Sequence, residues 1–364
     1  MYRVEGALSK VYEGSGEGVA VFSALGANVT LGSGGLASKS FYFKIPLAKP
    51  RGCRVSSGIL TIGITAPPTV KTPFRWRLEL DGLTISREAK PQFSTRLEDS
   101  TFYKVAFDVR PILAAKGELA VDSYTLRALY DSAHPIVVRE VSLFKVNSKP
   151  RLEHSAVYLT GALAIEPGES HTVTLRTPRS LEGGSRVLVL TLIIPSPRIT
   201  LNIRSGSEQL EVSGHGFKIV ELQPESEGEA RVAIDYPKPE ISIYPKRVLL
   251  TNVVLIENKI PTPPLRVQTE EVTIERGLLR VKLLISNEGD EAAEDIQVAL
   301  KHAMVNLKDV RIAQLEPGDA TSIILETDTS RIPATARKLT VKVTWSKDGI
   351  ASSKNIDLEL PSSS

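Results

Sequence analysis

The feature that most constrains the fold is an ordered series of strand-like segments that occurs twice in the first two thirds of this 364-residue chain. The first series consists of residues 55–67, 76–86, 103–109, 117–121 and 141–145. The second series consists, in the same order, of residues 187–195, 199–213, 217–222, 228–232 and 253–257. A fixed order of similar segments at a period of about 110 residues indicates two copies of one domain.

The composition of these segments predicts an all-β protein. They are short and rich in Ile, Val, Leu, Thr and Tyr, and they are separated by turn residues that include many of the 23 prolines and 25 glycines. Many short strands at regular spacing are typical of β-sandwiches or barrels. Residues 111–116 predict one helical turn, because proline suits the first helical position and Gly117 can end it. Residues 292–304 predict a strand, because their apolar residues alternate with a period of two.

Two proline-containing segments divide the chain. Residues 147–150 (Asn-Ser-Lys-Pro) follow the last strand of the first series, and residues 260–264 (Ile-Pro-Thr-Pro-Pro) follow the last strand of the second. Proline restricts both itself and its predecessor, so such segments are extended and stiff. The sequence therefore predicts three domains, 1–149, 150–262 and 263–364, arranged in a line.

The charge of the chain is unevenly distributed along it. The net charge is +3, and residues 1–150 carry 20 Lys and Arg against 13 Asp and Glu. The two-residue alternation of Arg75 and Arg77 around Trp76 predicts a solvated sheet face and a tryptophan that points into the core. An acidic partner, such as a phosphate backbone or an acidic glycan, is the alternative ligand of this stretch. Its basic residues are Arg75, Arg77, Arg87, Lys90, Arg96 and Lys104.

The sequence contains no recognisable catalytic motif. No nucleophile elbow occurs, and no serine has an evident base partner. Cys53 is the one cysteine, which excludes an internal disulfide and a cysteine-built metal site. His215 lies between two glycines and is expected in an exposed turn. No two histidines have metal-ligand spacing among His134, His154, His171, His215 and His302.

One acidic cluster offers oxygen ligands of the kind that calcium prefers. Its spacing matches no calcium-binding loop, so a solvated acidic turn is the favoured interpretation. The cluster consists of Glu288, Asp290, Glu291, Glu294 and Asp295. We therefore predict no catalytic, cofactor-binding or metal site and no cofactor.

The first unit resembles the galactose-binding-type jelly rolls that are appended to glycoside hydrolases and surface proteins. The resemblance rests on residues 76–86, where two strands flank the turn Asp81-Gly82, and on residues 102–119, with an aromatic, D-V, leucine and glycine pattern. It covers residues 20–147 and implies a scaffold rather than ligand chemistry. The second unit resembles this fold only through the repeated series.

The last unit resembles the immunoglobulin-like modules of the cell-adhesion-related type, which are common in archaeal surface-layer and bacterial surface proteins. Asn287 and Gly289 flank a turn after an apolar strand, Ala293 begins the next strand, and Leu315, Pro317 and Gly318 match a later turn. The resemblance covers residues 265–361 and implies a seven-strand sandwich. It also implies a spacer, adhesion or assembly module.

Together these observations predict tandem β-sandwiches, two jelly-roll-like units followed by an immunoglobulin-like sandwich. The expected function is that of a non-enzymatic structural, adhesion or assembly protein of a cell surface or extracellular filament. The alternative is a carbohydrate-binding protein that uses the first jelly roll, and a viral surface or capsid protein would show the same series. The expected partners are other protein subunits, including copies of this chain, and glycans at the first domain. We expect no nucleic acid as a partner and no membrane span, because the apolar runs are strand-sized.

The expected compartment rests on the N-terminus and on composition. Residues 1–10 contain glycine and charges where a secretion signal needs a continuous apolar stretch. Either the protein is cytoplasmic, or a signal precedes this numbering, and the surface-layer resemblance favours the cell surface. Asn28-Val29-Thr30 matches the acceptor pattern for N-glycosylation and weakly supports that location. Scarce Cys, Met, Asn and Gln beside abundant Val, Ile, Leu, Arg and Glu are typical of a thermophile, here expected to be archaeal.

Overall fold

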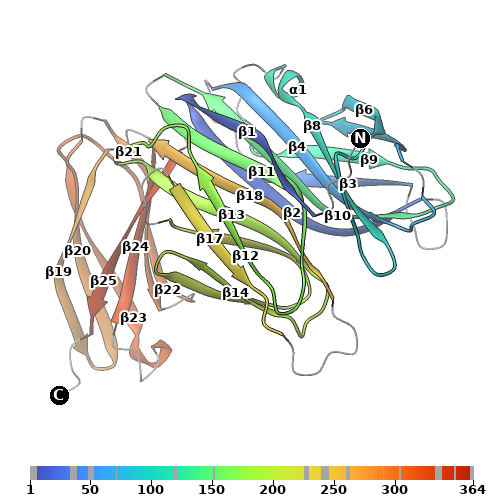
Figure 1. The fold of residues 1–364 in the computed structure, drawn as a ribbon. Coiled ribbons are helices and arrows are strands. Elements are labelled where there is room, and N and C mark those ends of the chain that lie inside the picture. The colour runs from blue at the N-terminus through green and yellow to red at the C-terminus, as the bar shows by residue number, and fades with distance from the viewer. Residues whose placement is uncertain are drawn as a thin grey trace. The chain divides into compact units, whose positions relative to one another are not determined.

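The computed structural model divides the chain into two compact units, Met1–Ile260 and Pro261–Ser364. Both units are built from antiparallel strands, as Figure 1 shows, so the all-β prediction is confirmed. The structure describes residues 6–32, 39–47, 53–70, 72–115, 117, 121–150, 152–224, 229–238, 246–259, 263–289, 291–302, 305–332, 338–347 and 350–360.

The first unit begins with a sandwich of two sheets, here called the first inner and the first outer sheet. The inner sheet has the order β2 (Val19–Leu31), β10 (Ile136–Ser148), β4 (Arg54–Ala66), β8 (Thr101–Asp108) and β7 (Phe93–Arg96). The outer sheet has the order β3 (Ser40–Ile45), β9 (Tyr124–Leu129), β5 (Phe74–Leu80) and β6 (Leu83–Ala89). Their facing side chains form one core, in which Trp76 is 3% exposed. The inward orientation predicted for this tryptophan is confirmed.

A second sandwich follows in the same unit, again with an inner and an outer sheet. The inner sheet has the order β1 (Leu8–Glu17), β11 (Glu153–Ile165), β18 (Val248–Lys259), β13 (Ser185–Ile194) and β16 (Gly216–Leu222). The outer sheet has the order β12 (Ser170–Arg176), β17 (Glu229–Asp235), β14 (Thr200–Ser205) and β15 (Glu208–Ser213). Leucine, isoleucine and valine side chains from both sheets fill the space between them.

The two sandwiches have the same topology. The order β2-β10-β4-β8 in the first corresponds to β11-β18-β13-β16 in the second, and β3-β9-β5-β6 corresponds to β12-β17-β14-β15. Four of the five repeated segment pairs therefore occupy equivalent strands. The pairing of residues 117–121 with 228–232 is wrong, because the counterpart of β17 is β9, and residues 118–120 lie outside the described part. The predicted helical turn is present as α1 (Arg110–Ala114).

The connection between the sandwiches differs from the expected hinge. Asn147 and Ser148 belong to β10, where Asn147 pairs with Val19, so half of the predicted linker is strand. β1, which the sequence places in the first domain, pairs along its length with β11 of the second sandwich. The second predicted hinge lies largely outside the described residues, since 260–262 are not described.

The two inner sheets pack face to face, so the unit has four layers (Figure 1). Their contact contains the aromatic rings of Phe22, Phe144 and Tyr158, with the Phe144 and Tyr158 ring centroids 5.6 Å apart. β10 and β18 are buried along nearly their whole length because both of their faces are covered. The expectation of domains in a line does not hold for these two sandwiches.

The second unit is a sandwich of a three-stranded and a four-stranded sheet. The former has the order β19 (Leu265–Glu275), β20 (Leu278–Asn287) and β23 (Ala320–Asp328). The latter has the order β22 (Val305–Leu315), β21 (Ala293–His302), β24 (Lys338–Lys347) and β25 (Ile350–Glu359). The strand predicted in residues 292–304 is thus confirmed. Leu283, Val298 and Trp345 contribute to a separate core.

The predicted turn residues of the second unit have specific structural roles. The Asn287 side chain is 1% exposed and donates hydrogen bonds to the carbonyl oxygens of Glu291 (2.8 Å) and Leu315 (2.9 Å). Gly318 has φ +80°, which a glycine adopts without strain, and its N–H donates to the Asn287 carbonyl (3.0 Å). Among the described residues of the chain, no helix has the length and apolar character needed to cross a bilayer.

Candidate functional site

Equivalent β-bulges interrupt the central strands of the two inner sheets. In β10, Val138 pairs with Ile64 and Glu140 pairs with the adjacent Gly63, so Arg139 is an extra residue relative to β4. In β18, Leu250 pairs with Leu192 and Asn252 pairs with the adjacent Thr191, so Thr251 is the extra residue relative to β13. A bulge re-aims the side chains beside it. Here it directs consecutive polar side chains of both strands toward the contact between the inner sheets.

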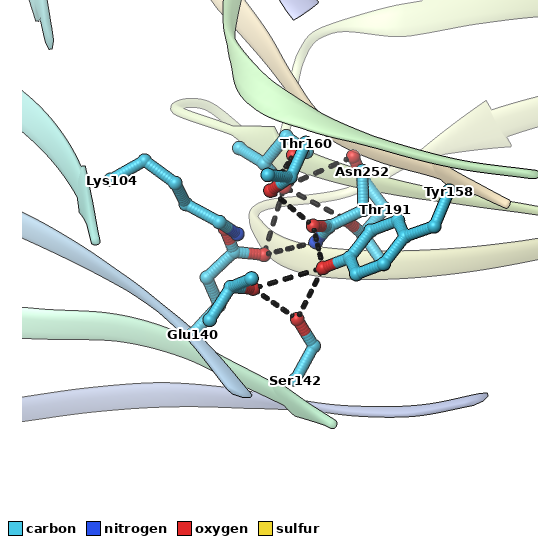
Figure 2. A network of polar contacts seen from close by, with 9 residues as sticks. Lys104, Glu140, Ser142, Tyr158, Thr160, Thr191 and Asn252 are labelled. Carbon is cyan, nitrogen blue, oxygen red and sulfur yellow. Dashed lines mark hydrogen bonds and ion pairs between the residues drawn. The ribbon is translucent and has the colours of Figure 1, made fainter. Parts of the chain in front are cut away.

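Glu140 is the centre of a polar network in that contact (Figure 2). Its carboxylate forms an ion pair with Lys104, and both side chains are fully buried. It also accepts hydrogen bonds from Thr251 Oγ1 (2.8 Å) and Asn252 Nδ2 (3.4 Å) of the facing sheet. The charged pair therefore comes from the first sandwich, whereas two of the neutral donors come from the second.

Tyr158 extends the network to the rest of the contact (Figure 2). Its hydroxyl donates to Asn252 Oδ1 (2.7 Å) and lies 3.1 Å from Thr61 Oγ1 of the opposite sheet. Thr160 Oγ1 donates to the same amide oxygen (2.8 Å), and Asn252 Nδ2 donates to Thr191 Oγ1 (2.7 Å). Buried polar groups of this kind are tolerated because each one has partners.

Burial dominates the electrostatics of this network. It lowers the pKa of Lys104, an effect that the neighbouring Glu140 opposes, and it raises the pKa of Tyr158 to about 12. Because Lys104 and Glu140 are closed to solvent, no substrate can reach them. The network links the two sheets through hydrogen bonds that cross their contact.

A pocket of about 520 Å³ lies at the same contact, beside the bulge of β10. Phe102 and Phe217 occupy equivalent places in it, since Phe102 pairs with Thr65 and Phe217 pairs with Ile193 in the corresponding strands. Both sandwiches line the pocket, through Gly26, Ala27, Asn28, Thr65, Leu97, Ser100, Phe102, Arg139, Ile193, Ile194, Pro195, His215, Gly216, Phe217, Arg247 and Leu249.

Two arginines supply the positive charge of this pocket. Arg139 Nε donates to Thr65 Oγ1 (3.2 Å), and its Nη1 donates to Asn28 Oδ1. Burial lowers the pKa of Arg139. Arg247 donates to the carbonyl oxygen of Arg96 (3.1 Å) and forms an ion pair with Glu166 (2.8 Å). Arg247 also lines a smaller adjoining pocket of about 330 Å³, together with Arg96, Leu97, Glu98, Glu166 and Pro167.

The basic stretch of the first domain does not form one surface. Lys104 is fully buried in the first inner sheet, whereas the other five basic residues of the stretch are exposed. Arg77, on the outer sheet, forms an ion pair with Glu79 (2.7 Å), as expected of a solvated sheet face. The alternation of residues identified that face, but it gave no sign that Lys104 belongs to a different sheet and lies in an interior contact.

The four histidines whose side chains the structure describes have separate environments. His154 is 5% exposed, its Nε2 lies 3.0 Å from the Tyr12 hydroxyl, and burial lowers its pKa. His171 lies 3.3 Å from Glu169, and His134 is exposed. His215 is exposed in a turn, as predicted, while the side chain of His302 lies outside the described part. No group of His, Cys, Asp and Glu among the described residues could hold a metal ion.

The acidic cluster of the second unit is paired with basic side chains. Glu288 forms an ion pair with Arg266 (3.3 Å), and Glu291 and Glu294 lie 3.9 and 3.7 Å from Lys347 Nζ. Asp290 lies outside the described residues. Glu288, Glu291 and Glu294 thus have counter-charges, and Glu294 and Asp295 belong to strand β21.

An exposed aromatic residue that the sequence analysis did not single out lies on the first outer sheet. Tyr42 is 58% exposed, and the Arg127 guanidinium carbon lies 5.4 Å from the centre of its ring. Tyr42, Arg127 and Glu79 are neighbours across β3, β9 and β5. The alternation in β3, where Tyr42 and Lys44 are exposed on either side of the buried Phe43, is the sequence feature that could have revealed this row.

Comparison with known proteins adds only weak similarities. No family model matches the chain, and no curated protein does. Solved structures that share part of the fold include a β-glucuronidase of Bacteroides uniformis, at 12% identity over 57% of this chain and 26% of that one, with a TM-score of 0.21. An exo-chitosanase of Amycolatopsis orientalis has 9% identity over 52% of this chain and 25% of that one, with a TM-score of 0.22.

A β-galacturonidase of Eisenbergiella tayi is similar at the same level, with 8% identity over 57% of this chain and 36% of that one and a TM-score of 0.22. The chain therefore spans between a quarter and two fifths of the length of these glycosidases. Superpositions of this quality carry no argument about activity. The functional argument rests on the side chains described above.

Proposed function

We propose that this chain is a non-enzymatic structural or assembly protein of a cell surface or extracellular filament, with its first 260 residues acting as one stiff block. The observation that carries the proposal is the contact between the two inner sheets, which contains an apolar cluster and hydrogen bonds from the second sandwich to the buried Glu140 of the first. A flexible ligand-capturing protein has no need of such a contact. A load-bearing subunit does, because it must keep its binding surfaces at a fixed spacing.

The physical basis of the stiffness is the cost of opening the contact. Rotating one sandwich against the other would separate Glu140 from Thr251 and Asn252 and would expose Phe144 and Tyr158. A hydrogen bond to a charged group contributes about 1.5–3 kcal/mol, so a movement that breaks the bonds from Thr251 and Asn252 to Glu140 is opposed. β1 also contributes, because it belongs to the sheet of the second sandwich and leads directly into β2 of the first.

The stiffness can be measured by pulsed electron paramagnetic resonance between spin labels at Arg75→Cys and Arg231→Cys, in a Cys53→Ala background. Both label positions are exposed, and they lie on the first and the second outer sheet. One narrow distance distribution is expected. Adding Glu140→Ala should broaden it, whereas Glu88→Ala, the same change at an exposed position, should not. A broad distribution in the labelled parent chain would contradict a stiff block.

The assembly role requires a separate measurement. Size-exclusion chromatography with light scattering on the full chain should show a concentration-dependent increase in mass. Negative-stain electron microscopy should then show ordered oligomers or filaments. A monomer at all concentrations would remove self-assembly from the proposal while leaving the stiffness result intact.

A second candidate function is carbohydrate binding by the first jelly roll, and the row of Tyr42, Arg127 and Glu79 favours it. An exposed aromatic ring can stack on the apolar face of a sugar, and neighbouring charged side chains can bind hydroxyl groups. Calorimetry with the best ligand from a glycan array should show that Tyr42→Ala abolishes binding. Phe41→Ala is the matched control, because Phe41 is also exposed (40%) but is the neighbouring residue, on the opposite side of β3. Equal binding by both variants would exclude this surface.

A further inference from the structure

The pocket beside the β10 bulge has an unbalanced charge. Its lining contains the cationic side chains of Arg139 and Arg247 and the imidazole of His215, and no Asp or Glu is among its described lining residues. The rest of the lining is mostly apolar, with Phe102, Phe217, Leu249 and two isoleucines. Small-molecule sites commonly have about 300–1,000 Å³ of space, an apolar wall and a few convergent polar groups.

Arg139 is the residue that distinguishes this pocket from ordinary surface hollows. Its hydrogen-bond partners, Thr65 and Asn28, are neutral, and among the residues that the structure describes it pairs with no carboxylate. Its Nη2 makes no hydrogen bond to a described residue, although a guanidinium can donate five. A half-buried cation without a counter-charge is unfavourable unless an anion is present. Arg139 therefore has a positive charge and donors that an anion in the pocket could use.

The bulge explains why the guanidinium is in this position. Arg139 is the extra residue in β10, and its equivalent in the second sandwich is Thr251, which is buried in the polar network. A threonine would satisfy the strand geometry at this place, so the fold itself does not require an arginine. The Arg139 side chain extends from the bulge to the pocket lining. Its guanidinium is held there by hydrogen bonds to Thr65 and Asn28.

The opposite side of the pocket limits what kind of anion can bind. Arg247 is already paired with Glu166, so its charge is largely neutralised at the rim. Phe217 packs tightly against Gly26, where even a Cβ atom would lie 2.7 Å from the Phe217 Cβ. The site thus combines a guanidinium whose Nη2 makes no hydrogen bond to a described residue with a wall of aromatic and aliphatic side chains.

We propose that this pocket binds a small organic oxyanion, a carboxylate or a phosphate monoester with an apolar or ring-shaped body. Arg139 binds the oxyanion through an N–H of Nη2, and the second N–H of Nη1 can complete a two-bond contact of the kind that guanidinium and oxyanions favour. The body of the ligand packs against Phe102 and Phe217, and His215 lies at the entrance. The inference is independent of the assembly role, because a stiff block can form with the pocket empty or filled.

Ligand-observed NMR on the full chain tests the proposal, with benzoate and phenyl phosphate as the probes and benzamide and phenol as their neutral analogues. We expect saturation transfer from the protein to both anions, with dissociation constants about tenfold or more below those of the neutral analogues. The relative affinities of benzoate and phenyl phosphate distinguish a carboxylate site from a phosphate site.

Variants assign the binding to Arg139. Arg139→Thr, which introduces the residue type of the equivalent position 251, should weaken anion binding about tenfold or more, since a charge-assisted hydrogen bond is lost. Arg139→Lys, which keeps the charge but loses the fork, should be intermediate. Arg231→Gln removes one exposed positive charge elsewhere and should bind like the parent chain. Far-UV circular dichroism and a denaturation midpoint show whether each variant is folded.

The results that would overturn the proposal are specific. Absence of saturation transfer from both anions at 10 mM, a concentration of the order at which weak fragments bind, would exclude the site. If Arg139→Thr and Arg231→Gln weaken anion binding equally, the binding reflects the overall positive charge of the chain and not a site at Arg139. If Arg139→Thr does not fold, Phe217→Leu provides the second measurement, and it should weaken both anions by about threefold or more through lost apolar contact.

Discussion

Arg139 and Thr251 occupy equivalent positions in the two sandwiches, each as the extra residue of a bulge in the central strand of an inner sheet. Their neighbours Glu140 and Asn252 are equivalent as well, and Asn252 Nδ2 donates to the Glu140 carboxylate across the contact. One backbone irregularity, present in both copies, thus supplies polar side chains to both sides of one interface. In the first copy it also supplies the guanidinium of the proposed anion pocket.

The buried ion pair should behave as a coupled unit. Lys104→Ala and Glu140→Ala should each reduce the free energy of unfolding by about 3–5 kcal/mol, because each leaves a buried charge without its partner. The double variant Lys104→Met/Glu140→Leu should cost much less than the sum, although Thr251 and Asn252 lose an acceptor. The chain has two tryptophans, Trp76 and Trp345, one in each unit. Urea denaturation of a Trp345→Phe background, followed by fluorescence, therefore reports on the first unit alone. A double variant whose loss of unfolding free energy equals the sum of the two single losses would contradict the coupling of Lys104 and Glu140.

Asn287 should be essential to the second unit and irrelevant to the first. Asn287→Ala removes two side-chain donors from buried carbonyl groups, as well as the amide oxygen that accepts from the Gly289 N–H (3.0 Å). The expected loss is about 2–4 kcal/mol, since each unsatisfied buried group costs about 1–3 kcal/mol. Fluorescence of Trp345 in a Trp76→Phe background measures it. Asn355→Ala, at an exposed position of β25, should change stability by less than about 0.5 kcal/mol. A matching loss in both units would indicate that they do not unfold independently.

Acidification should destabilise the first unit through His154. Burial holds the pKa of His154 below its usual value of 6.5, so below pH 6.5 the unfolded chain binds a proton that the folded chain does not. The contribution of neutral His154 to the free energy of unfolding is therefore complete above pH 6.5. It is lost as the pH falls through the pKa of the folded state. Thermal denaturation between pH 7.5 and 5 should show this decrease, and His154→Gln should reduce it. His134→Gln, at an exposed histidine, should leave it unchanged. If His154→Gln loses as much stability on acidification as the parent chain, the loss arises from the carboxylates and not from His154.

Alkaline pH should destabilise the first unit. Burial raises the pKa of both Tyr158 and Tyr124 from 10.0 to about 12, so above pH 10 the unfolded chain loses phenolic protons that the folded chain retains. The contribution of these two protonated tyrosines to the free energy of unfolding is complete below pH 10. It is lost as the pH rises to about 12. Lys104 acts in the opposite direction, because its lowered pKa lets stability rise with pH up to 10.5. Denaturation midpoints at pH 9, 10.5 and 11.5 should reveal the decline. Tyr158→Phe should flatten it, and an unchanged slope would show that Tyr158 ionises freely.

Much of the fold could be predicted from local sequence, because local steric and hydrophobic preferences decide it. The two-residue alternation around Trp76 places this side chain in the core, and the turn chemistry of Asn287 and Gly318 marks where strands end. The repeated order of segments anticipates two sandwiches that share the order of their common strands, while β1 and β7 have no counterparts. It failed at residues 117–121, where a short apolar segment precedes the true strand β9.

The candidate site was decided by tertiary structure alone. Nothing near Lys104 in the sequence indicates that its ammonium is buried against Glu140, because the two are 36 positions apart and meet only through strand pairing and a bulge. The pocket is lined by Arg139 of one sandwich and Phe217 of the other, which come together only because the inner sheets face each other. The sequence by itself thus determined the strands, the repeat and the turns. The partner of each sheet face was decided by packing, because a continuous apolar strand shows that both faces are covered but not what covers them.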